Sequence, residues 1–338
     1  MTTAGIIANP ASGKDIRRLV AYGSVFDNQE KVRIVRRVLL GLEAIGLDRI
    51  FYMPDYFGIV ARALSRIDLN ISAEPLDLTL TGTQEDSVQA AKMMADKGVG
   101  CIVTLGGDGT NRAVVKGNGS VPILPISTGT NNVFPAMVEG TVAGLAAGLI
   151  AGDQVPLAES TFAHTQLEVV VDGEPVDLAL VDAVVYDGVF KGSRAVWELE
   201  KVHTAFLNRA QPENIGLSSL GGQLHPLQAY EPLGLCLELG KAGRSVVAPV
   251  APGVIREVHI RRQRLMKVGE EINIQLKPSV LALDGEREVE IRKDQSAAIR
   301  LAGKGPVVVD VPRTMRAAMQ RKILAPDVDD EPKHFGTD

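Results

Sequence analysis

Short apolar runs alternate with helix-like segments through the first half of the chain, and this alternation restricts the fold more than any other feature. The runs 5–8, 99–105 and 121–126 are apolar at nearly every position, which is typical of strands that are buried on both faces of a sheet. Between them, 28–45 carries apolar residues at helical spacing. The alternation predicts a Rossmann-like parallel α/β domain over residues 1–152.

Further elements of this domain follow from local patterns. Residues 50–53 and 76–80 are expected to be strands. Thr83 followed three positions later by Asp86 resembles a capping box, which predicts a helix through about Asp96. A run of small residues predicts another helix over 137–151.

The second half of the chain has a different rhythm, with short apolar runs separated by Gly, Pro, Asp and Asn. This pattern predicts an antiparallel β-sandwich domain over residues 153–300. The strands are expected at 167–171, 176–186, 233–239, 253–260, 272–276, 280–283 and 289–291. Residues 301–325 are expected to form a strand and a basic helix that return to the first domain, and 326–338 a disordered polar tail.

Composition excludes several classes of function. The 338 residues carry a net charge of −5 and have a pI near 5.7, whereas binding to a nucleic-acid backbone needs a basic surface. No apolar stretch is long enough to span a membrane. Cys101 and Cys236 lie far apart in apolar surroundings, as expected of buried thiols in a reducing compartment. We therefore expect a cytoplasmic protein with no nucleic-acid partner and no membrane association.

Three polar loops follow predicted strands of the first domain. They are the first loop, residues 9–14, the second loop, residues 106–110, and the third loop, residues 128–132. Ligands of open α/β sheets bind at the carboxyl ends of strands, where loops lead into helix N-termini. The glycines of the second loop would let main-chain N–H groups approach phosphate oxygens. The three loops therefore predict a phosphate-binding site.

Asp108 places a carboxylate within the glycines of the second loop. A carboxylate repels phosphate unless it binds a metal–phosphate complex or takes a proton from an incoming hydroxyl, and phosphoryl transfer needs both. Gly-Gly-Asp-Gly is also ordinary turn chemistry. From this motif alone, a catalytic carboxylate and a simple turn both remain open.

In combination, the three loops resemble the NAD kinase and diacylglycerol kinase superfamily. Its members carry an early Asn-Pro-x-Ser/Ala-Gly loop, a Gly-Gly-Asp-Gly-Thr loop and a third glycine-threonine loop, which Asn9–Gly13, Gly106–Thr110 and Gly129–Asn132 match in order. In the second domain, Ser218–Pro226 is similar to the Ser-Ala-Gly-Gly-Pro-x-x-His-Pro segment of the NAD kinase branch, and Leu281–Glu286 to a late Asp-Gly-Gln/Glu turn. The stretches NPASGKDIRRL and TGTNNVFP are most like the ATP-NAD kinase family proteins of acetoin catabolism, called acetoin-catabolism protein X.

The resemblance implies an ATP-dependent small-molecule kinase with Mg²⁺ as cofactor and a homo-oligomeric assembly. The default acceptor is NAD, which would give NADP. Asp108 corresponds to the catalytic aspartate, and Asp182, Asp284 and Glu286 are candidates for contacts to the acceptor or the nucleotide. Nothing in the sequence identifies the Mg²⁺ ligands. The expected nucleotide contacts are Asn9, Ser12, Gly13, Gly106, Gly107, Gly109, Thr110, Thr128, Gly129, Thr130, Asn131 and Asn132.

Departures from the family pattern leave other functions open. Val181 stands where NAD kinases have an asparagine, and 211–217 replaces the Thr-Gly-Ser-Thr-Ala-Tyr stretch that helps hold the acceptor. Val133 stands where the lipid kinases have an aspartate, which disfavours a lipid acceptor. Two alternatives remain: a kinase for another hydroxyl metabolite linked to acetoin catabolism, and a non-catalytic nucleotide-binding regulator.

Overall fold

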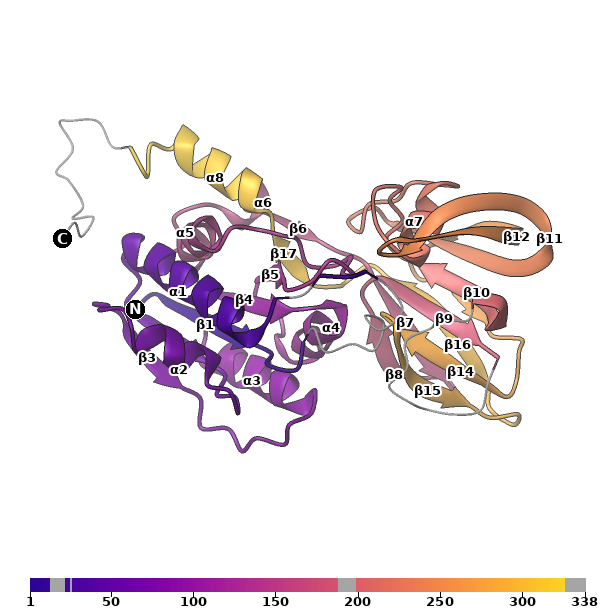
Figure 1. The fold of residues 1–338 in the computed structure, drawn as a ribbon, viewed down its shortest axis with the longest axis horizontal. Coiled ribbons are helices and arrows are strands. Elements are labelled where there is room, and N and C mark those ends of the chain that lie inside the picture. Colours follow the sequence, from indigo (N-terminus) through magenta and orange to yellow (C-terminus); the bar gives the residue numbers. More distant parts are fainter. Residues whose placement is uncertain (13–21, 25, 188–198, 326–338) are drawn as a thin grey trace.

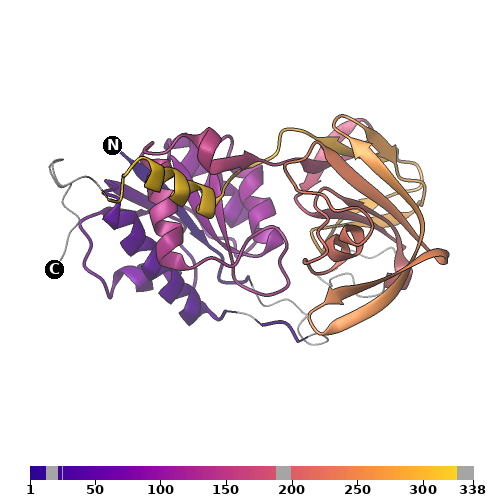
Figure 2. The ribbon, with the colours of Figure 1, turned by 90° about the horizontal axis from the view of Figure 1, so that it is seen from above.

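The computed structural model describes residues 1–12, 22–24, 26–187 and 199–325, and Figures 1 and 2 show two lobes joined along the long axis of the molecule. The helices gather in the first lobe and most strands in the second. The elements of the first lobe are β1 (Thr3–Ala8), α1 (Asn28–Ala44), β2 (Arg49–Tyr52), α2 (Ile59–Leu64), β3 (Ser72–Pro75), α3 (Glu85–Asp96), β4 (Cys101–Gly106), α4 (Asp108–Gly117), β5 (Ile123–Ser127) and α5 (Gly140–Ala151).

The first lobe is built on a seven-stranded sheet with the order β3-β2-β1-β4-β5-β17-β6. All neighbouring pairs are parallel except β17 (Val307–Val309) with β6 (Thr161–Ala163). The parallel α/β domain expected from the alternating sequence is therefore confirmed. Because β1, β4 and β5 are neighbours, their carboxyl ends, and the three loops that follow them, lie at one edge of the sheet.

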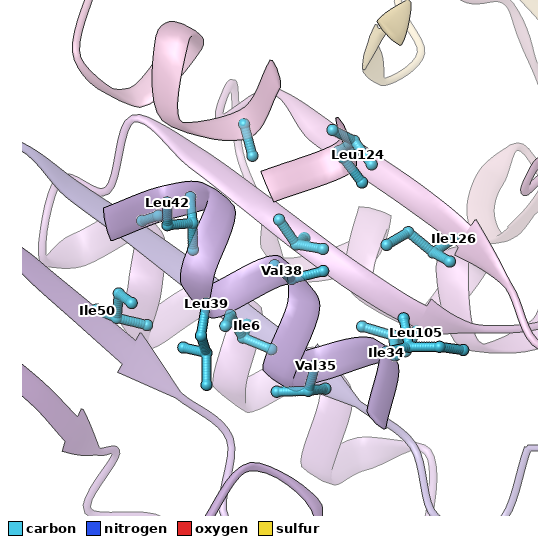
Figure 3. Packing of buried hydrophobic residues seen from close by; sticks show 14 of the residues in the cluster. Ile6, Ile34, Val35, Val38, Leu39, Leu42, Ile50, Leu105, Leu124 and Ile126 are labelled. Atoms are coloured by element: carbon cyan, nitrogen blue, oxygen red, sulfur yellow. The ribbon is translucent and has the colours of Figure 1, made fainter. Parts of the chain in front are cut away.

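Alternate residues of β1 explain why helices cover both faces of this sheet. Ile6 packs against α1, α2 and α5 on one face, as Figure 3 shows for its contact with α1. Ile7 packs against α3 and α4 on the other. Both side chains are fully buried, and burying one such side chain stabilises a fold by about 1.5–3 kcal/mol.

Helices α1 and α5 cross in close contact because glycine occupies the crossing. A Cβ added at Gly144 would lie 2.2 Å from the main-chain oxygen of Val38, and one added at Gly41 would lie 2.4 Å from that of Thr141. Real side chains do not reach these distances. The crossing therefore requires glycine on both helices.

The second lobe is a sandwich of two antiparallel sheets, as expected from the sequence. The six-stranded sheet has the order β12-β11-β10-β9-β14-β15 and the four-stranded sheet the order β13-β16-β7-β8, with an apolar core between them. The elements are β7 (Gln166–Val171), β8 (Glu174–Ala179), β9 (Asp182–Tyr186), the 3-10 helix η2 (Leu199–Lys201), β10 (Val202–Leu207), α7 (Leu217–Gly222), β11 (Leu233–Ala251), β12 (Val254–Lys267), β13 (Glu271–Asn273), β14 (Ser279–Leu283), β15 (Glu286–Ile291) and β16 (Ala297–Ala302).

The chain passes from the first lobe to the sandwich and back again. Helix α6 (Leu157–Ser160) and β6 lead out of the first lobe. After β16, strand β17 pairs with β5, and helix α8 (Val311–Gln320) packs against α5 through Ala317 and Ala318. The tail 326–338 lies outside the described residues.

Several local expectations were wrong. Residues 76–80 form no strand, and the edge strand β3 lies just before them, at Ser72–Pro75. Helix α3 ends at Asp96 as expected, but its N-cap is Gln84 rather than Thr83, and the Asp86 carboxylate accepts hydrogen bonds from the amides of Thr81 and Gly82 instead of closing a capping box. The strands expected at 233–239 and 253–260 belong to a much longer hairpin, β11–β12. Elements α2, α4, α6, β6, β10, α7 and β16 were not predicted. The single strand expected at 176–186 is two strands, β8 and β9, which belong to different sheets of the sandwich.

Candidate active site: three loops between two lobes

The first loop is tied to both of the other loops. The Asn9 amide nitrogen donates a hydrogen bond to Thr110 Oγ1 over 2.9 Å, and the hydroxyls of Ser12 and Thr128 lie 3.2 Å apart. Asn9 and Ser12 therefore lie where the sequence placed them, beside the second and third loops. Gly13 lies outside the described residues.

A buried lysine donates hydrogen bonds to the main chain of the first loop. Lys31, on α1, is 1% exposed, and its Nζ donates to the main-chain oxygens of Asn9 (2.9 Å) and Ser12 (2.7 Å) and to Oδ1 of Asn28 (3.1 Å). Charged side chains are rarely buried without partners of this kind. Lys31 therefore holds the first loop and brings a positive charge beneath the expected phosphate site.

The second loop is the junction of strand β4 with helix α4. Gly106 ends the strand, Gly107 caps the helix without a side-chain hydrogen bond, and Asp108 is the first helical residue. A Cβ at Gly107 would lie 2.7 Å from Asn132 Oδ1, and one at Gly106 2.5 Å from the Thr110 side chain. These glycines let the strand end, the helix start and the third loop approach one another. The first turn of α4 directs main-chain N–H groups toward this edge, an arrangement that favours anions.

Side chains of the third loop fold it back on itself. Ser127 donates to the oxygen of Gly129, and the Asn132 amide donates to Ser127 Oγ over 2.8 Å. Thr130 Oγ1 accepts from the Ser24 amide at 2.9 Å. Much of the hydrogen-bonding capacity of Thr130 and Asn132 therefore shapes the loop, and their direct contact with a nucleotide stays a prediction, as it does for Thr128, Gly129 and Asn131.

The Asp108 carboxylate is held across the junction of the second and third loops. It accepts hydrogen bonds from the amides of Val133 (3.0 and 3.2 Å) and Phe134 (2.7 Å), directly after the third loop. These partners lie 25 and 26 residues away in the sequence, so the motif is more than a local turn. Asp108 is half-buried, with its carboxylate fixed at the edge where the three loops meet.

Arg209, which follows β10 in the sandwich, extends from the second lobe to the main chain at Val133 and Phe134. Its Nη1 donates to the main-chain oxygens of Val133 and Phe134, and its guanidinium lies 5.5 Å from the centre of the Phe134 ring. Burial lowers the pKa of Arg209, and the attraction of the Asp108 carboxylate opposes this shift. A positive charge from one lobe therefore lies near the candidate catalytic carboxylate of the other.

A second buried group of charges joins the lobes around Arg112 of α4. Arg112 is fully buried and forms ion pairs with Asp177 (3.4 Å), Asp284 (3.7 Å) and Glu286 (3.7 Å), all from the sandwich. Asp177 also pairs with Lys116 at 2.6 Å. Arg112 thereby ties the helix that carries Asp108 to strands β8 and β15 and to the turn between β14 and β15.

Asp284 occupies that turn and is enclosed rather than presented to the loops. Its carboxylate accepts from the amides of Leu180, Val181 and Asp182 at 2.8–3.3 Å. Burial raises the pKa of Asp284 to about 7 and outweighs the lowering by Arg112 and the amides, while the Asp108 charge raises it further. Asp284 thus supports the junction of the lobes, and its contact with a ligand stays a prediction.

Glu286 and Asp182 lie near the same junction with different surroundings. Glu286 is partly exposed, accepts from the Gln84 amide of the first lobe, and has a carboxylate oxygen 2.8 Å from the position of a Cβ at Gly109. It therefore lies beside the first turn of α4. Asp182 is half-buried at the start of β9. Both remain candidates for ligand contacts.

The described residues contain no group of three or more His, Cys, Asp or Glu side chains placed to hold a metal ion. None of the helices within those ranges is both long enough and apolar enough to cross a membrane. Both Cys101 and Cys236 are buried, and burial raises the pKa of each thiol to about 12.

The sequence did not reveal Lys31, Arg112 or Arg209 as parts of this site. Lys31 and Arg112 lie on helices in which lysine and arginine are normally solvated, and the partners of Arg112 are 65 or more residues away in the sequence. The one sequence signal for their burial is the apolar residues that flank them. That signal does not identify the residues with which these side chains pair.

Each half of the chain matches a known family model. Residues 5–154 match the family model of the ATP-NAD kinase N-terminal domain, and residues 165–304 match that of the acetoin catabolism protein X C-terminal domain. Acetoin catabolism protein X of Cupriavidus necator is 38% identical over 334 residues, which cover 95% of this chain and 93% of that protein. An NAD kinase of Methanosarcina acetivorans is 24% identical over 72% of this chain and 82% of that protein. Among solved structures, yeast NADH kinase complexed with NADH aligns with a TM-score of 0.48 and 15% identity, covering 99% of this chain and 90% of that one.

Proposed function

Because the chain belongs to the acetoin catabolism protein X family and has a kinase-type first lobe, we propose that it is an ATP-dependent kinase that transfers a phosphoryl group to a hydroxyl of a small molecule. The observation that carries the proposal is the position of Asp108. Its carboxylate lies at the N-terminus of α4, where the second and third loops meet, and faces charged residues of the second lobe.

The first lobe supplies the phosphate-binding half of the proposed site. Main-chain N–H groups at the start of α4 and in the third loop bind the phosphates of ATP, and Lys31 adds positive charge beneath the first loop. A Mg²⁺ ion bound with the nucleotide would neutralise charge on its phosphates. The described residues offer no cluster of carboxylates, and since Asp108 is needed as the base, the residue that would hold Mg²⁺ is Glu286, a single carboxylate beside the first turn of α4. This fits Mg²⁺, which in phosphoryl-transfer sites takes one or two carboxylates with phosphates and water.

Asp108 is the proposed general base. It accepts the proton of the acceptor hydroxyl while that oxygen forms a bond to the γ-phosphorus and the bond from the γ-phosphorus to the leaving oxygen of ADP breaks. Assistance of this kind is worth about 10²–10⁴-fold in rate. The amides of Val133 and Phe134 hold the carboxylate in place, so little reorganisation is needed during the reaction.

We propose NAD as the first acceptor to test, because the Methanosarcina relative is an NAD kinase. A second candidate is another hydroxyl metabolite, linked to acetoin catabolism through the Cupriavidus relative. Val181 favours this second candidate. Its side chain has no hydrogen-bonding group for a ribose, and it is 2% exposed within an apolar cluster.

Product analysis with labelled ATP, Mg²⁺ and a panel of acceptors tests the proposal. Formation of NADP supports NAD as acceptor, and transfer only to another hydroxyl compound supports the second candidate. Nucleotide binding without transfer to any member of a broad panel would contradict the proposed activity and favour a regulator. We also propose that the protein is a homo-oligomer, which sedimentation of the purified protein tests, and that it is cytoplasmic, which fractionation of cells tests.

A further inference from the structure

One peptide unit at the lobe interface is bound at both of its ends by opposite charges. The amide of Phe134 donates to Asp108 Oδ1 over 2.7 Å, and the carbonyl oxygen of the same peptide, that of Val133, accepts from Arg209 Nη1 over 2.5 Å. The next carbonyl, of Phe134, accepts from the same nitrogen over 3.2 Å. The guanidinium of the second lobe and the carboxylate of the first are thus connected through a single peptide group.

Arg209 is itself firmly held within the second lobe. Ser218 of α7 donates from its hydroxyl to the Arg209 main-chain oxygen over 2.9 Å, and the neighbouring Ala210 pairs with Leu227. The guanidinium is directed into the interface, where its Nη2 lies 3.5 Å from Nδ1 of His164. The donors of Arg209 therefore have a fixed direction that the sandwich sets.

Rigid hydrogen bonds in series support one another, because a peptide whose oxygen is bound by a cation becomes a better donor at its nitrogen. An arginine in this position does more than fill space: it orients the peptide and strengthens its hold on the carboxylate. Lysine carries its charge on one tetrahedral nitrogen at the end of a shorter, more flexible chain, so it would not fix the direction of the bonds to the Val133 and Phe134 oxygens as the planar guanidinium does.

We propose that Arg209 is the positioning residue for Asp108, acting through the Val133–Phe134 peptide, so that the carboxylate is correctly aimed only when the sandwich is docked. This inference rests on the proposed kinase function for its kinetic part. Its structural part, the coupling of Arg209 to the third-loop amides, is independent of any activity.

Two variants of Arg209 and a matched pair elsewhere test the coupling. Arg209→Gln removes the charge, and Arg209→Lys retains it without the planar donors. Arg313 provides the control, because it also donates to main-chain oxygens, of Thr161 and Ala158, and lies over an aromatic ring, that of Phe162, 4.3 Å away. The first readout is amide hydrogen exchange of the peptides that contain Val133 and Phe134 and of those from β4.

In the exchange experiment, both Arg209 variants should raise the exchange rate of the Val133 and Phe134 amides by about tenfold or more, while β4 stays protected. Asp108→Ala should raise the same rates, because it removes the acceptor directly. Arg313→Gln and Arg313→Lys should leave these amides unchanged. Unchanged exchange in Arg209→Lys would overturn the inference, and that variant decides the matter if Arg209→Gln does not fold.

The kinetic readout separates positioning from nucleotide binding. With whichever acceptor the wild type uses, Arg209→Lys should lower kcat by up to about 10²-fold, as small displacements of catalytic groups do, and change the KM for ATP by less than about threefold. An unchanged kcat, or a loss confined to KM, would overturn the positioning role. A wild type without turnover would contradict the proposed function alone, since the exchange result still tests the coupling.

Discussion

The buried carboxylate of Asp284 makes a quantitative prediction about how stability depends on pH. Its pKa is raised from 3.8 to about 7, chiefly by burial, with Arg112 opposing the shift. The folded state therefore binds a proton at pH values where the unfolded chain has released it. The stabilising contribution is fully present below the unfolded pKa near 3.8, and it is lost as pH rises through about 7.

The size of this effect follows from the shift. Each pH unit between the two pKa values changes the free energy of unfolding by about 1.4 kcal/mol. Between about pH 5 and pH 8 the Asp284 contribution should therefore fall by about 3 kcal/mol. The variant Asp284→Asn retains an oxygen that can accept from the Val181 amide, but it has no carboxyl group to titrate.

The assay is urea unfolding of the wild type and of Asp284→Asn over this pH range. Asp172 provides the control, because it occupies a turn of the same backbone geometry. The φ angles are 51° and 89° at Asp172-Gly173 and 50° and 84° at Asp284-Gly285. Unlike Asp284, however, Asp172 is exposed and its pKa is lowered. As pH rises from about 5 to 8, the wild type should lose stability relative to Asp284→Asn. The difference in free energy of unfolding between wild type and Asp172→Asn should stay constant over the same range. Parallel profiles for wild type and Asp284→Asn would refute the raised pKa.

Two further predictions test the packing and the phosphate site. Gly144→Ala forces a methyl group against the Val38 oxygen and should lower the free energy of unfolding by about 1–3 kcal/mol. Gly240→Ala is the control, because the nearest atom to its added methyl group is 3.6 Å away. In the same urea assay, it should change the free energy of unfolding by less than about 1 kcal/mol. Lys31→Met leaves two main-chain oxygens of the first loop without their buried donor, so calorimetry should show ATP affinity weakened by about tenfold or more; unchanged affinity would exclude Lys31 from the phosphate site.

The sequence predicted elements best where periodicity alone decides them. Helix α1 was expected at 28–45 and lies at Asn28–Ala44, because its apolar stripe faces the sheet. The edge strand β3, Ser72–Pro75, has no such pattern, since an edge strand buries little. Residues 76–80 alternate in the manner of a strand, yet lie beyond the sheet.

Within the site, the sequence predicted the loops but not their connections. Order and spacing placed Asp108 beside the third loop, whereas its acceptor role toward Val133 and Phe134 depends on how β4 and β5 are paired. Arg209 was hidden for a similar reason. Its partners come from another lobe, and no local pattern distinguishes a buried arginine from a solvated one.

The most direct test of the central claim is the rate of phosphoryl transfer by Asp108→Asn. Its amide oxygen can still accept from the Val133 and Phe134 amides, so the loop is retained while the base is lost. Asp55→Asn is the control, since Asp55 also accepts from successive main-chain amides, those of Phe57, Gly58 and Ile59, outside the three loops. We predict that Asp108→Asn lowers single-turnover transfer from ATP to the acceptor by at least about 10²-fold with ATP affinity nearly unchanged. Transfer at the wild-type rate would contradict the account.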